Sequence, residues 1–246
     1  MNAEHSAQLR LLDLQAADTS IAQLAHRRRT LPELAALARQ GEQADALGND
    51  LVDAETTLAD IADDQTRLET EVDTVRSRTS RDQNRLQAGG LPPKELEGLQ
   101  HEITTLARRQ STLEDDLLEI MEHREEAEAL VVGLAAQRDA LAAQLAELAA
   151  TRDGAFTEID AALAQRSRER AAIAAEIPAD LMALYERARE HGGGVGAARM
   201  RQRRCEGCRI ELSGSELATA RAAAPDEVVR CDNCRRILVR TDESGL

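Results

Sequence analysis

Aromatic side chains are almost absent from this chain of 246 residues, in which Phe156 and Tyr185 stand alone and tryptophan does not occur. A globular core of this size normally contains several large rings. The apolar residues are mostly Ala and Leu, and 31% of all residues are charged. Because this composition is typical of long helices and coiled coils, it argues against compact α/β enzyme folds and β-sandwiches.

Long hydrophobic runs are also missing. No apolar stretch approaches the ~18 residues typical of a membrane-spanning helix, and Met1–Arg10 is too polar for a signal peptide. We therefore expect a soluble, cytoplasmic protein that has no membrane partner. In that reducing compartment, the four cysteines are not expected to form structural disulfides.

Negative charge predominates, but its distribution is uneven. Residues 192–246 contain ten Arg and eight Asp or Glu, a formal charge of +2, whereas the whole chain has a formal charge of −14. The larger part of the chain should therefore repel nucleic acid, and only the C-terminal segment could attract it.

Apolar residues between Leu96 and Ile173 recur with alternating spacings of three and four, and the same period runs from Leu51 to Leu86. Sustained heptads with charged residues between them indicate a coiled coil. The intervening residues 88–93 include two Gly and two Pro, which cannot continue a helix. The pattern predicts two helices of an antiparallel hairpin with a turn near residues 88–93. Polar residues interrupt the second helix every fourteen positions and are expected to fix its register: Gln110, Arg124, Arg138, Arg152 and Arg166.

Breaks in this pattern divide the chain into three predicted domains. The hairpin spans residues 1–177, and Thr30 and Glu33 are spaced as a capping box that restarts a helix within it. Residues 178–196 hold a short helix and a glycine-rich joint, which we expect to be flexible, and residues 197–246 form a compact module. We expect this module to dock weakly against the short helix, whose apolar side chains are Leu181, Leu184 and Tyr185. The module could cover them with Ile210, Leu212 or Val239.

Two Cys-x-x-Cys pairs lie in the C-terminal module, separated by 22 residues: Cys205, Cys208, Cys231 and Cys234. Each pair places two thiolates on one tight turn, and two such turns complete a tetrahedral Zn²⁺ site. A redox role would need only one pair at the start of a helix in a βαβ unit, which the sequence does not indicate. We therefore expect one structural Zn²⁺ per chain, with no open position for catalysis. At the two turns, Gly207 and Asn233 are expected to adopt positive φ angles.

The residues between the two cysteine pairs predict a helix inserted into the zinc ribbon. Ser213 and Glu216 form a capping box before residues 217–223, and Pro225 ends the helix. After the second pair, the Ile-Leu-Val run at residues 237–239 predicts a short strand.

Four arginines lie just before the first cysteine pair: Arg199, Arg201, Arg203 and Arg204. They form either a contact surface for nucleic acid or another partner, or a solvated basic edge that balances the negative charge of a zinc–tetrathiolate centre. Residues 192–246 contain no aromatic side chain, so the usual stacking platform for single-stranded nucleic acid is missing. Both interpretations stay open at this point.

Catalytic signatures are absent as well. The five His are scattered without a partner spaced for a triad or a metal site. The sequence contains no P-loop, no dinucleotide-binding turn and no nucleophile elbow. We expect a protein that is not an enzyme and has no small-molecule substrate.

Three segments together resemble a bacterial family of C4-type zinc ribbon proteins with an N-terminal coiled-coil hairpin. Residues 92–103 are similar to the family's hairpin tip, and residues 185–187 with the 192–196 joint are similar to its linker. The two cysteine pairs, with residues 235–238, resemble its ribbon, although Arg235 and Val239 stand where the family commonly has Gly and Tyr. The resemblance implies chaperones or adaptors for the nitrogen-type sigma factor and for flagellar export parts, with RNA contact also proposed.

Together these features predict a mainly α protein, with a long antiparallel coiled-coil hairpin followed by a small C-terminal four-cysteine zinc ribbon. Its leading predicted function is that of a non-enzymatic, chaperone-like adaptor that binds partner proteins, in transcription or its regulation. The alternative is a protein that binds RNA or DNA through the ribbon and the adjacent arginine cluster.

Overall fold

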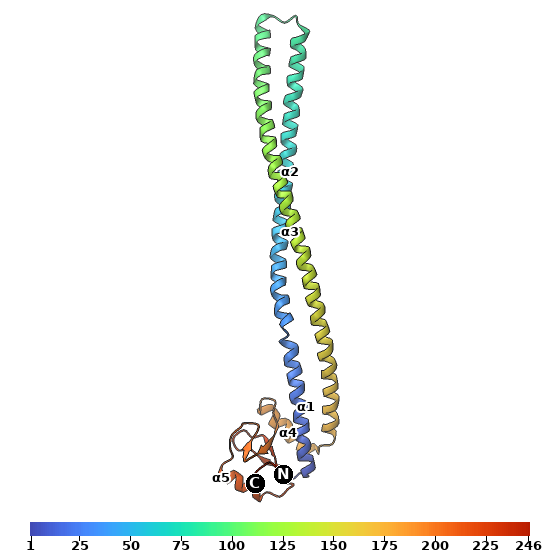
Figure 1. The fold of residues 1–246 in the computed structure, drawn as a ribbon, viewed down its shortest axis with the longest axis vertical. Coiled ribbons are helices and arrows are strands. Elements are labelled where there is room, and N and C mark those ends of the chain that lie inside the picture. Colours follow the sequence, from blue (N-terminus) through green and yellow to red (C-terminus); the bar gives the residue numbers. More distant parts are fainter. The chain divides into compact units, whose positions relative to one another are not determined.

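The computed structural model describes residues 1–246 and contains five helices and four short strands. In chain order these are α1 (His5–Arg29), α2 (Pro32–Ala88), α3 (Pro93–Ala175), α4 (Ala179–His191), β1 (Ala197–Arg201), β2 (Arg204–Cys205), α5 (Gly214–Ala222), β3 (Val229–Arg230) and β4 (Ile237–Val239) (Figure 1). None of the helices combines the length and the hydropathy needed to cross a membrane.

Two compact units make up the chain. The hairpin unit comprises Ala35–Ala149, and the ribbon unit comprises Met1–Leu34 together with Ala150–Leu246. The first 34 residues therefore belong with the zinc ribbon, whereas the sequence analysis placed them with the hairpin.

In the hairpin unit, α2 and α3 run antiparallel beside each other, which confirms the predicted coiled-coil hairpin (Figure 1). Their connection includes Gly89 and Gly90, whose φ angles of 70° and 79° favour glycine. Residues of the predicted heptads form the buried seam between the helices, among them Leu51, Ala54, Val72, Leu99 and Leu113.

Polar residues that interrupt the heptads differ in how they pair. Nη1 of Arg124 donates a 3.0 Å hydrogen bond to Oε1 of Gln65 on the opposite helix. Arg138 instead forms an ion pair at 2.8 Å with the adjacent Asp139 of its own helix. Arg124 thus makes the kind of contact between helices that fixes register, whereas the partner of Arg138 lies beside it in sequence.

The break between α1 and α2 lies where the sequence predicted a helix to restart, but the predicted capping box is wrong. The Thr30 hydroxyl donates a 3.0 Å hydrogen bond back to the carbonyl oxygen of His26 and so caps the end of α1. Oε2 of Glu33 is buried without a hydrogen-bond partner. The second arm has no matching break, because α3 continues through Gly154.

The zinc ribbon contains a four-stranded sheet with the order β2-β1-β4-β3. Strands β1 and β4 are parallel, and the other neighbours are antiparallel. The first residues of the chain pair with the loop before β3: the Ala3 amide donates to the Asp226 carbonyl at 2.7 Å, and the Val228 amide donates to the Met1 carbonyl at 3.0 Å. The N-terminus is therefore part of the ribbon unit's structure.

One apolar core joins α1, α4 and the sheet. Leu11 and Leu14 of α1 pack with Leu181 and Tyr185 of α4 and with Val239 of β4, and all five are buried. Val239 thus packs against the apolar side chains of α4, as expected. Of the other two residues predicted to do so, Leu212 belongs to a second cluster around the cysteines, and Ile210 is exposed. No sequence pattern predicts that Leu11 and Leu14 of α1 also pack against the apolar side chains of α4.

The glycine-rich joint is hydrogen-bonded on both sides. Gln15 accepts from the Gly196 amide at 2.7 Å and donates to the Gly194 carbonyl at 3.1 Å, while Nε of Arg236 donates to the Val195 carbonyl at 3.1 Å. A Cβ atom on Gly196 would lie 2.6 Å from the carbonyl oxygen of Tyr185. Close packing therefore requires a glycine at this position, a constraint that the sequence pattern does not reveal.

Candidate metal centre

Tight turns at the ends of short strands present the four cysteines. Cys205 ends β2, and the Arg209 amide donates back to its carbonyl at 2.7 Å. Cys231 follows β3, and the Arg235 amide makes the same contact with its carbonyl at 2.8 Å. The two turns have matching hydrogen bonds, so each directs two sulfur atoms to one side.

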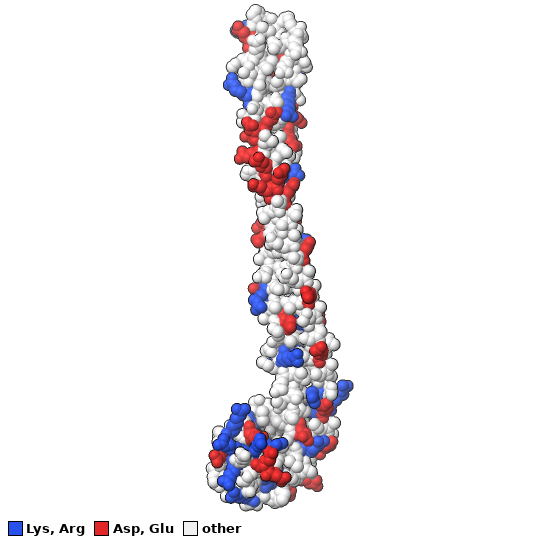
Figure 2. Space-filling model, in the orientation of Figure 1, with Lys and Arg blue, Asp and Glu red and all other residues white.

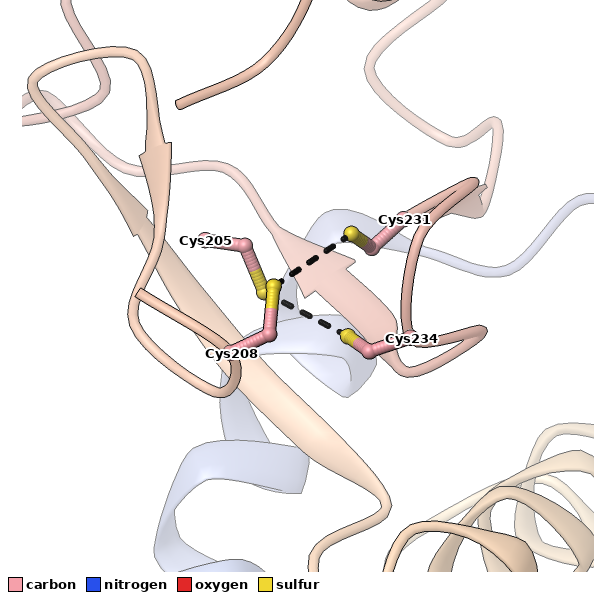
Figure 3. A group of neighbouring side chains, drawn as sticks. All are labelled: Cys205, Cys208, Cys231 and Cys234. Atoms are coloured by element: carbon pink, nitrogen blue, oxygen red, sulfur yellow. Dashed lines mark hydrogen bonds between the residues drawn. The ribbon is translucent and has the colours of Figure 1, made fainter. Parts of the chain in front are cut away.

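The four sulfur atoms point toward a common centre, with one pair from each turn (Figure 3). All four lie within 4.8 Å of one another. Across the turns, the Sγ atoms of Cys205 and Cys234 are 3.8 Å apart, and those of Cys208 and Cys231 are 3.9 Å apart. Sulfur atoms at about 2.3 Å from a tetrahedral Zn²⁺ are about 3.8 Å from each other. The structure thus brings the four predicted ligands together, and the two distances across the turns match those of a zinc site.

Burial and hydrogen bonding act differently on the thiols of Cys205, Cys231 and Cys234. Burial raises the pKa of the Cys205 and Cys231 thiols above the ordinary range. Burial acts in the same direction at Cys234, but hydrogen bonds from the Arg236 amide and from the neighbouring thiols lower its pKa overall. A divalent cation would replace the protons of such a cluster, because metal binding requires deprotonated thiolates.

The backbone of the two turns differs from the sequence expectation. Positive φ angles occur at Arg209 (62°) and Arg235 (63°), one residue after each pair, and not at Gly207 or Asn233. The left-handed conformation costs a residue with a side chain about 1–2 kcal/mol. The family that the sequence resembles commonly has Gly at the position of Arg235, which fits this backbone.

Gly207 has a different role in the first turn. A Cβ atom there would lie 2.7 Å from Cδ of Arg236 and 3.0 Å from Cβ of Ala198. Its carbonyl accepts a 2.9 Å hydrogen bond from Nη1 of Arg236, whose guanidinium also donates to the carbonyls of Gly192 and Val195. Arg236 therefore links the metal centre to the end of α4 and to the joint.

The helix inserted between the cysteine pairs has the predicted start. Ser213 and Glu216 form the capping box of α5, and Glu216 also accepts from the Asp232 amide at 3.3 Å. The other end of α5 is held by Arg240, whose guanidinium donates to five carbonyls, those of Ala220, Ala223, Ala224, Pro225 and Glu227. No sequence pattern marks this arginine, because its partners are backbone carbonyl groups.

All four arginines of the predicted cluster are exposed on the ribbon, and each has a polar partner. Arg199 and Arg201 lie on β1, with Glu243 at 3.5 Å and 3.3 Å. Arg204 faces Glu211 at 3.8 Å, and Arg203 donates to the Gly245 carbonyl at 3.2 Å. Figure 2 shows basic and acidic side chains mixed on this part of the molecule.

A set of buried polar residues on α1 was missed by the sequence analysis. Asp18 accepts a 2.8 Å hydrogen bond from the Tyr185 hydroxyl and forms a 2.9 Å ion pair with Arg170. Gln8 donates to the carbonyls of Ala3 and Pro225. With Gln15, these residues hold α1 against α4, α3 and the ribbon, but most of their partners lie far away in sequence, so no local pattern marks these side chains.

A two-helix coiled-coil hairpin joined to a four-cysteine zinc ribbon defines the class of this protein. Residues 14–193 match the CT398-like coiled coil hairpin domain, and residues 204–238 match the C4-type zinc ribbon domain. The chain belongs to the CT398-like coiled-coil hairpin family.

Relatives with this arrangement occur in mycobacteria and beyond. An uncharacterized protein of Mycobacterium tuberculosis is 40% identical over 242 residues, which cover 98% of both chains. A solved structure from Mycobacterium smegmatis is 39% identical and covers 98% of this chain and 100% of its own, with a TM-score of 0.87. The structure of CT398 from Chlamydia trachomatis covers 96% of this chain and 98% of its own at 20% identity, with a TM-score of 0.67, which shows likeness of fold.

Proposed function

We propose that this protein is a non-enzymatic, cytoplasmic adaptor that binds partner proteins and contains one structural Zn²⁺ per chain. The four-thiolate centre supports the structural role of the metal. Four protein ligands fill a tetrahedral zinc and leave no position for a substrate or a reactive water. Zinc in such a site stabilises a fold that is too small to form an adequate apolar core.

The observation that carries the adaptor proposal is a group of exposed apolar side chains on the hairpin unit. Five large apolar residues are exposed there, namely Val52, Leu118, Met121, Leu130 and Val132. Four of them fall within fifteen consecutive residues of α3, and three of these four, Leu118, Met121 and Val132, share one flank of the helix. Grouped apolar side chains on a surface mark sites of association with other proteins. Coiled-coil hairpins and zinc ribbons also commonly serve as interaction modules.

A role in transcription or its regulation is the finer part of the proposal. It rests on the family resemblance, which implies sigma-factor and flagellar chaperones or adaptors. Residues 192–246, with their formal charge of +2, also place positive charge near any partner of the ribbon.

Affinity capture tests the adaptor proposal. The tagged full-length chain is recovered from its native cells with and without nuclease treatment, and the tag alone serves as the control. We expect at least one protein to be enriched in near-equal amount and to stay bound after nuclease treatment. Recovery of no protein above the control would contradict the proposal.

The alternative function is binding of RNA or DNA, and the exposure of the four ribbon arginines favours it. If it is correct, an Arg201→Ala/Arg203→Ala/Arg204→Ala variant loses affinity for random oligonucleotides and has a smaller salt dependence. A variant with Ala at Arg39, Arg85 and Arg108 removes the same charge from exposed positions outside the ribbon. Equal binding by both variants would exclude a specific role for the arginine cluster.

A further inference from the structure

Almost all of the chain's net charge lies in one part of the hairpin unit. Residues 113–128 of α3 contain eight Asp or Glu and one arginine, Arg124, a formal charge of −7. Residues 60–73 of α2 contain six Asp or Glu and one arginine, Arg67, a formal charge of −5. The whole chain carries −14. Figure 2 shows these acidic side chains gathered on the hairpin unit.

Exposed apolar residues of α3 in this region lie beside the seam and not within it. Leu117, Ile120 and Val131 belong to the heptads that face α2 and are partly buried. The residues one position later are Leu118, Met121 and Val132, and they are 61%, 41% and 68% exposed. Successive residues of a helix are about 100° apart, so these three side chains share one flank of α3.

Residues of α2 extend the same flank. Val52 is 59% exposed and directly follows the seam residue Leu51. Because α2 and α3 are antiparallel, positions that directly follow the seam lie on the same side of both helices. A hollow of about 180 Å³ is lined by Gln65 of α2 and by Met121, Arg124, Glu125 and Glu128 of α3. We call this side of the hairpin the Met121 face; it comprises Val52, Leu118, Met121, Val132 and the hollow.

Acidic residues without a basic partner border the Met121 face. Some carboxylates of the region pair with arginines across the hairpin, such as Glu114 with Arg76 at 2.7 Å. Asp63, Glu122 and Glu125 have no Arg or Lys within 4.0 Å. The apolar side chains are therefore flanked by negative charge that the chain itself does not balance.

We propose that the Met121 face binds a basic amphipathic helix of a partner protein, which packs along α2 and α3 as a third helix. Positions 118, 121, 125, 128 and 132 alternate in spacing between three and four, the spacing of a coiled-coil seam, with Leu, Met and Val at three of them and Glu at the other two. Leu118 to Val132 spans roughly four turns at about 3.6 residues per turn. The proposal rests on the adaptor function and names the surface and the chemistry of the partner.

The negative charge around the Met121 face determines which kind of partner can bind there. A second copy of the hairpin would bring the same excess of carboxylates against it, and nucleic acid would be repelled for the same reason. Lysine or arginine beside the apolar stripe of a partner helix would pair with Glu122 and Glu125 while Leu118 and Met121 become buried. Such an arrangement matches both the apolar and the acidic parts of the face.

A synthetic helical peptide tests this proposal with the full-length chain. The probe has Leu at alternating spacings of three and four over three heptads and Lys at the flanking positions, and binding is followed by fluorescence anisotropy. We expect Leu118→Gln/Met121→Gln to weaken binding about tenfold or more, because both side chains lose buried apolar area. Leu130→Gln is the matched control: Leu130 is 55% exposed but precedes the seam residue Val131 and so lies on the other flank.

Charge variants test whether the carboxylates beside the Met121 face contribute to binding of the basic peptide. Glu125→Gln should weaken binding and reduce its salt dependence, whereas Glu119→Gln, on the flank of Leu130, should leave both unchanged. The same peptide with Glu in place of Lys should not bind. Equal effects of Leu130→Gln and Leu118→Gln/Met121→Gln would overturn the proposal. Self-association that Leu118→Gln/Met121→Gln abolishes would also overturn it, since a second copy would then occupy the face.

Affinity capture with the same double variant separates this proposal from the adaptor function. Loss of the captured protein from Leu118→Gln/Met121→Gln, but not from Leu130→Gln, supports the Met121 face. Equal capture by both variants overturns the face and leaves the adaptor function intact. Capture of no protein by the unaltered chain contradicts the adaptor function itself.

Discussion

Oε1 of Gln15 accepts a 2.7 Å hydrogen bond from the backbone amide of Gly196, a residue 181 positions further along the chain. The Tyr185 hydroxyl, whose one proton is shared with the shorter contact to Asp18, lies 3.1 Å from the same Oε1, and the side-chain amide of Gln15 donates to the Gly194 carbonyl. One residue of α1 therefore holds both the joint before the ribbon and the only tyrosine of the chain. Because these groups are buried, their hydrogen bonds are costly to remove.

Replacement of Gln15 by Ala should destabilise the ribbon unit by about 2 kcal/mol, since it leaves the buried Gly196 amide without a partner. Chemical denaturation followed by the fluorescence of Tyr185 measures this change, because the chain contains no Trp and no other Tyr. Gln23→Ala on the same helix removes an exposed side chain and should alter stability by less than about 0.5 kcal/mol. Equal effects of the two substitutions would refute the role of Gln15.

The pH dependence of stability should reflect Tyr185. Its burial and its hydrogen bond to Asp18 raise the pKa of the phenol well above the ordinary value of about 10. A group whose pKa is raised by folding stabilises the protein below its unfolded pKa, and this contribution is lost as the pH rises above about 10. Titration of the ultraviolet absorbance should show tyrosinate only when the ribbon unit unfolds. Ionisation near pH 10 in the folded protein, as for a free phenol, would contradict the buried contact.

Tyr185→Phe is the companion variant for this titration. It removes the ionisable hydroxyl and its bond to Asp18 but keeps the ring that packs against Leu11 and Leu181. We expect a loss of roughly 1–3 kcal/mol at neutral pH and a flatter stability curve in alkali, both measured by circular dichroism. If the stability of Tyr185→Phe falls at alkaline pH as much as that of the unaltered protein, groups other than Tyr185 cause the fall.

Metal content and folding of the ribbon should depend on every cysteine of the centre. Elemental analysis of the reduced protein should give one zinc per chain, and Cys208→Ser should lose the metal and unfold the ribbon while α2 and α3 stay helical. Ile210→Ser, at an exposed position two residues further on, should keep its zinc. A full complement of zinc in Cys208→Ser would show that the four sulfur atoms do not form the site.

Close packing at Gly207 gives a further prediction. Gly207→Ala would place Cβ against Arg236 and Ala198, and this overpacking should cost about 1–3 kcal/mol. Displacement of Arg236 should also speed the loss of zinc to a chelator. Gly214→Ala is the control, because a Cβ atom there meets nothing within 4 Å. Similar rates of zinc loss in the two variants would contradict the role assigned to Arg236.

Features with a local sequence signal were predicted well. The heptads of α2 and α3 specify a hairpin because each residue's neighbours in the seam are three or four positions away. The two cysteine pairs and the capping box of Ser213 and Glu216 are also defined by spacing alone, and the structure has both. Each of these features depends on residues that lie close together in the chain.

Features that depend on distant parts of the chain were missed or wrong. The partners of Gln15 and Asp18 on α4 and in the joint lie more than 150 residues away, so nothing in α1 marks these side chains as buried. Because glycine adopts positive φ easily, the sequence predicts it at Gly207, but the observed turn has it at Arg209. Gly207 is needed instead for its close approach to Arg236, which no local pattern reveals.

Photo-crosslinking in living cells tests the proposed adaptor function and its surface most directly. A photoreactive residue is placed at Leu118 or at Leu130, and crosslinked peptides are identified by mass spectrometry. We predict that position 118 crosslinks to a lysine- or arginine-rich helical segment of one partner protein, and that position 130 does not. Crosslinks to no protein from either position, or to the same proteins in equal yield from both, would contradict the proposed binding of a partner protein at the Met121 face.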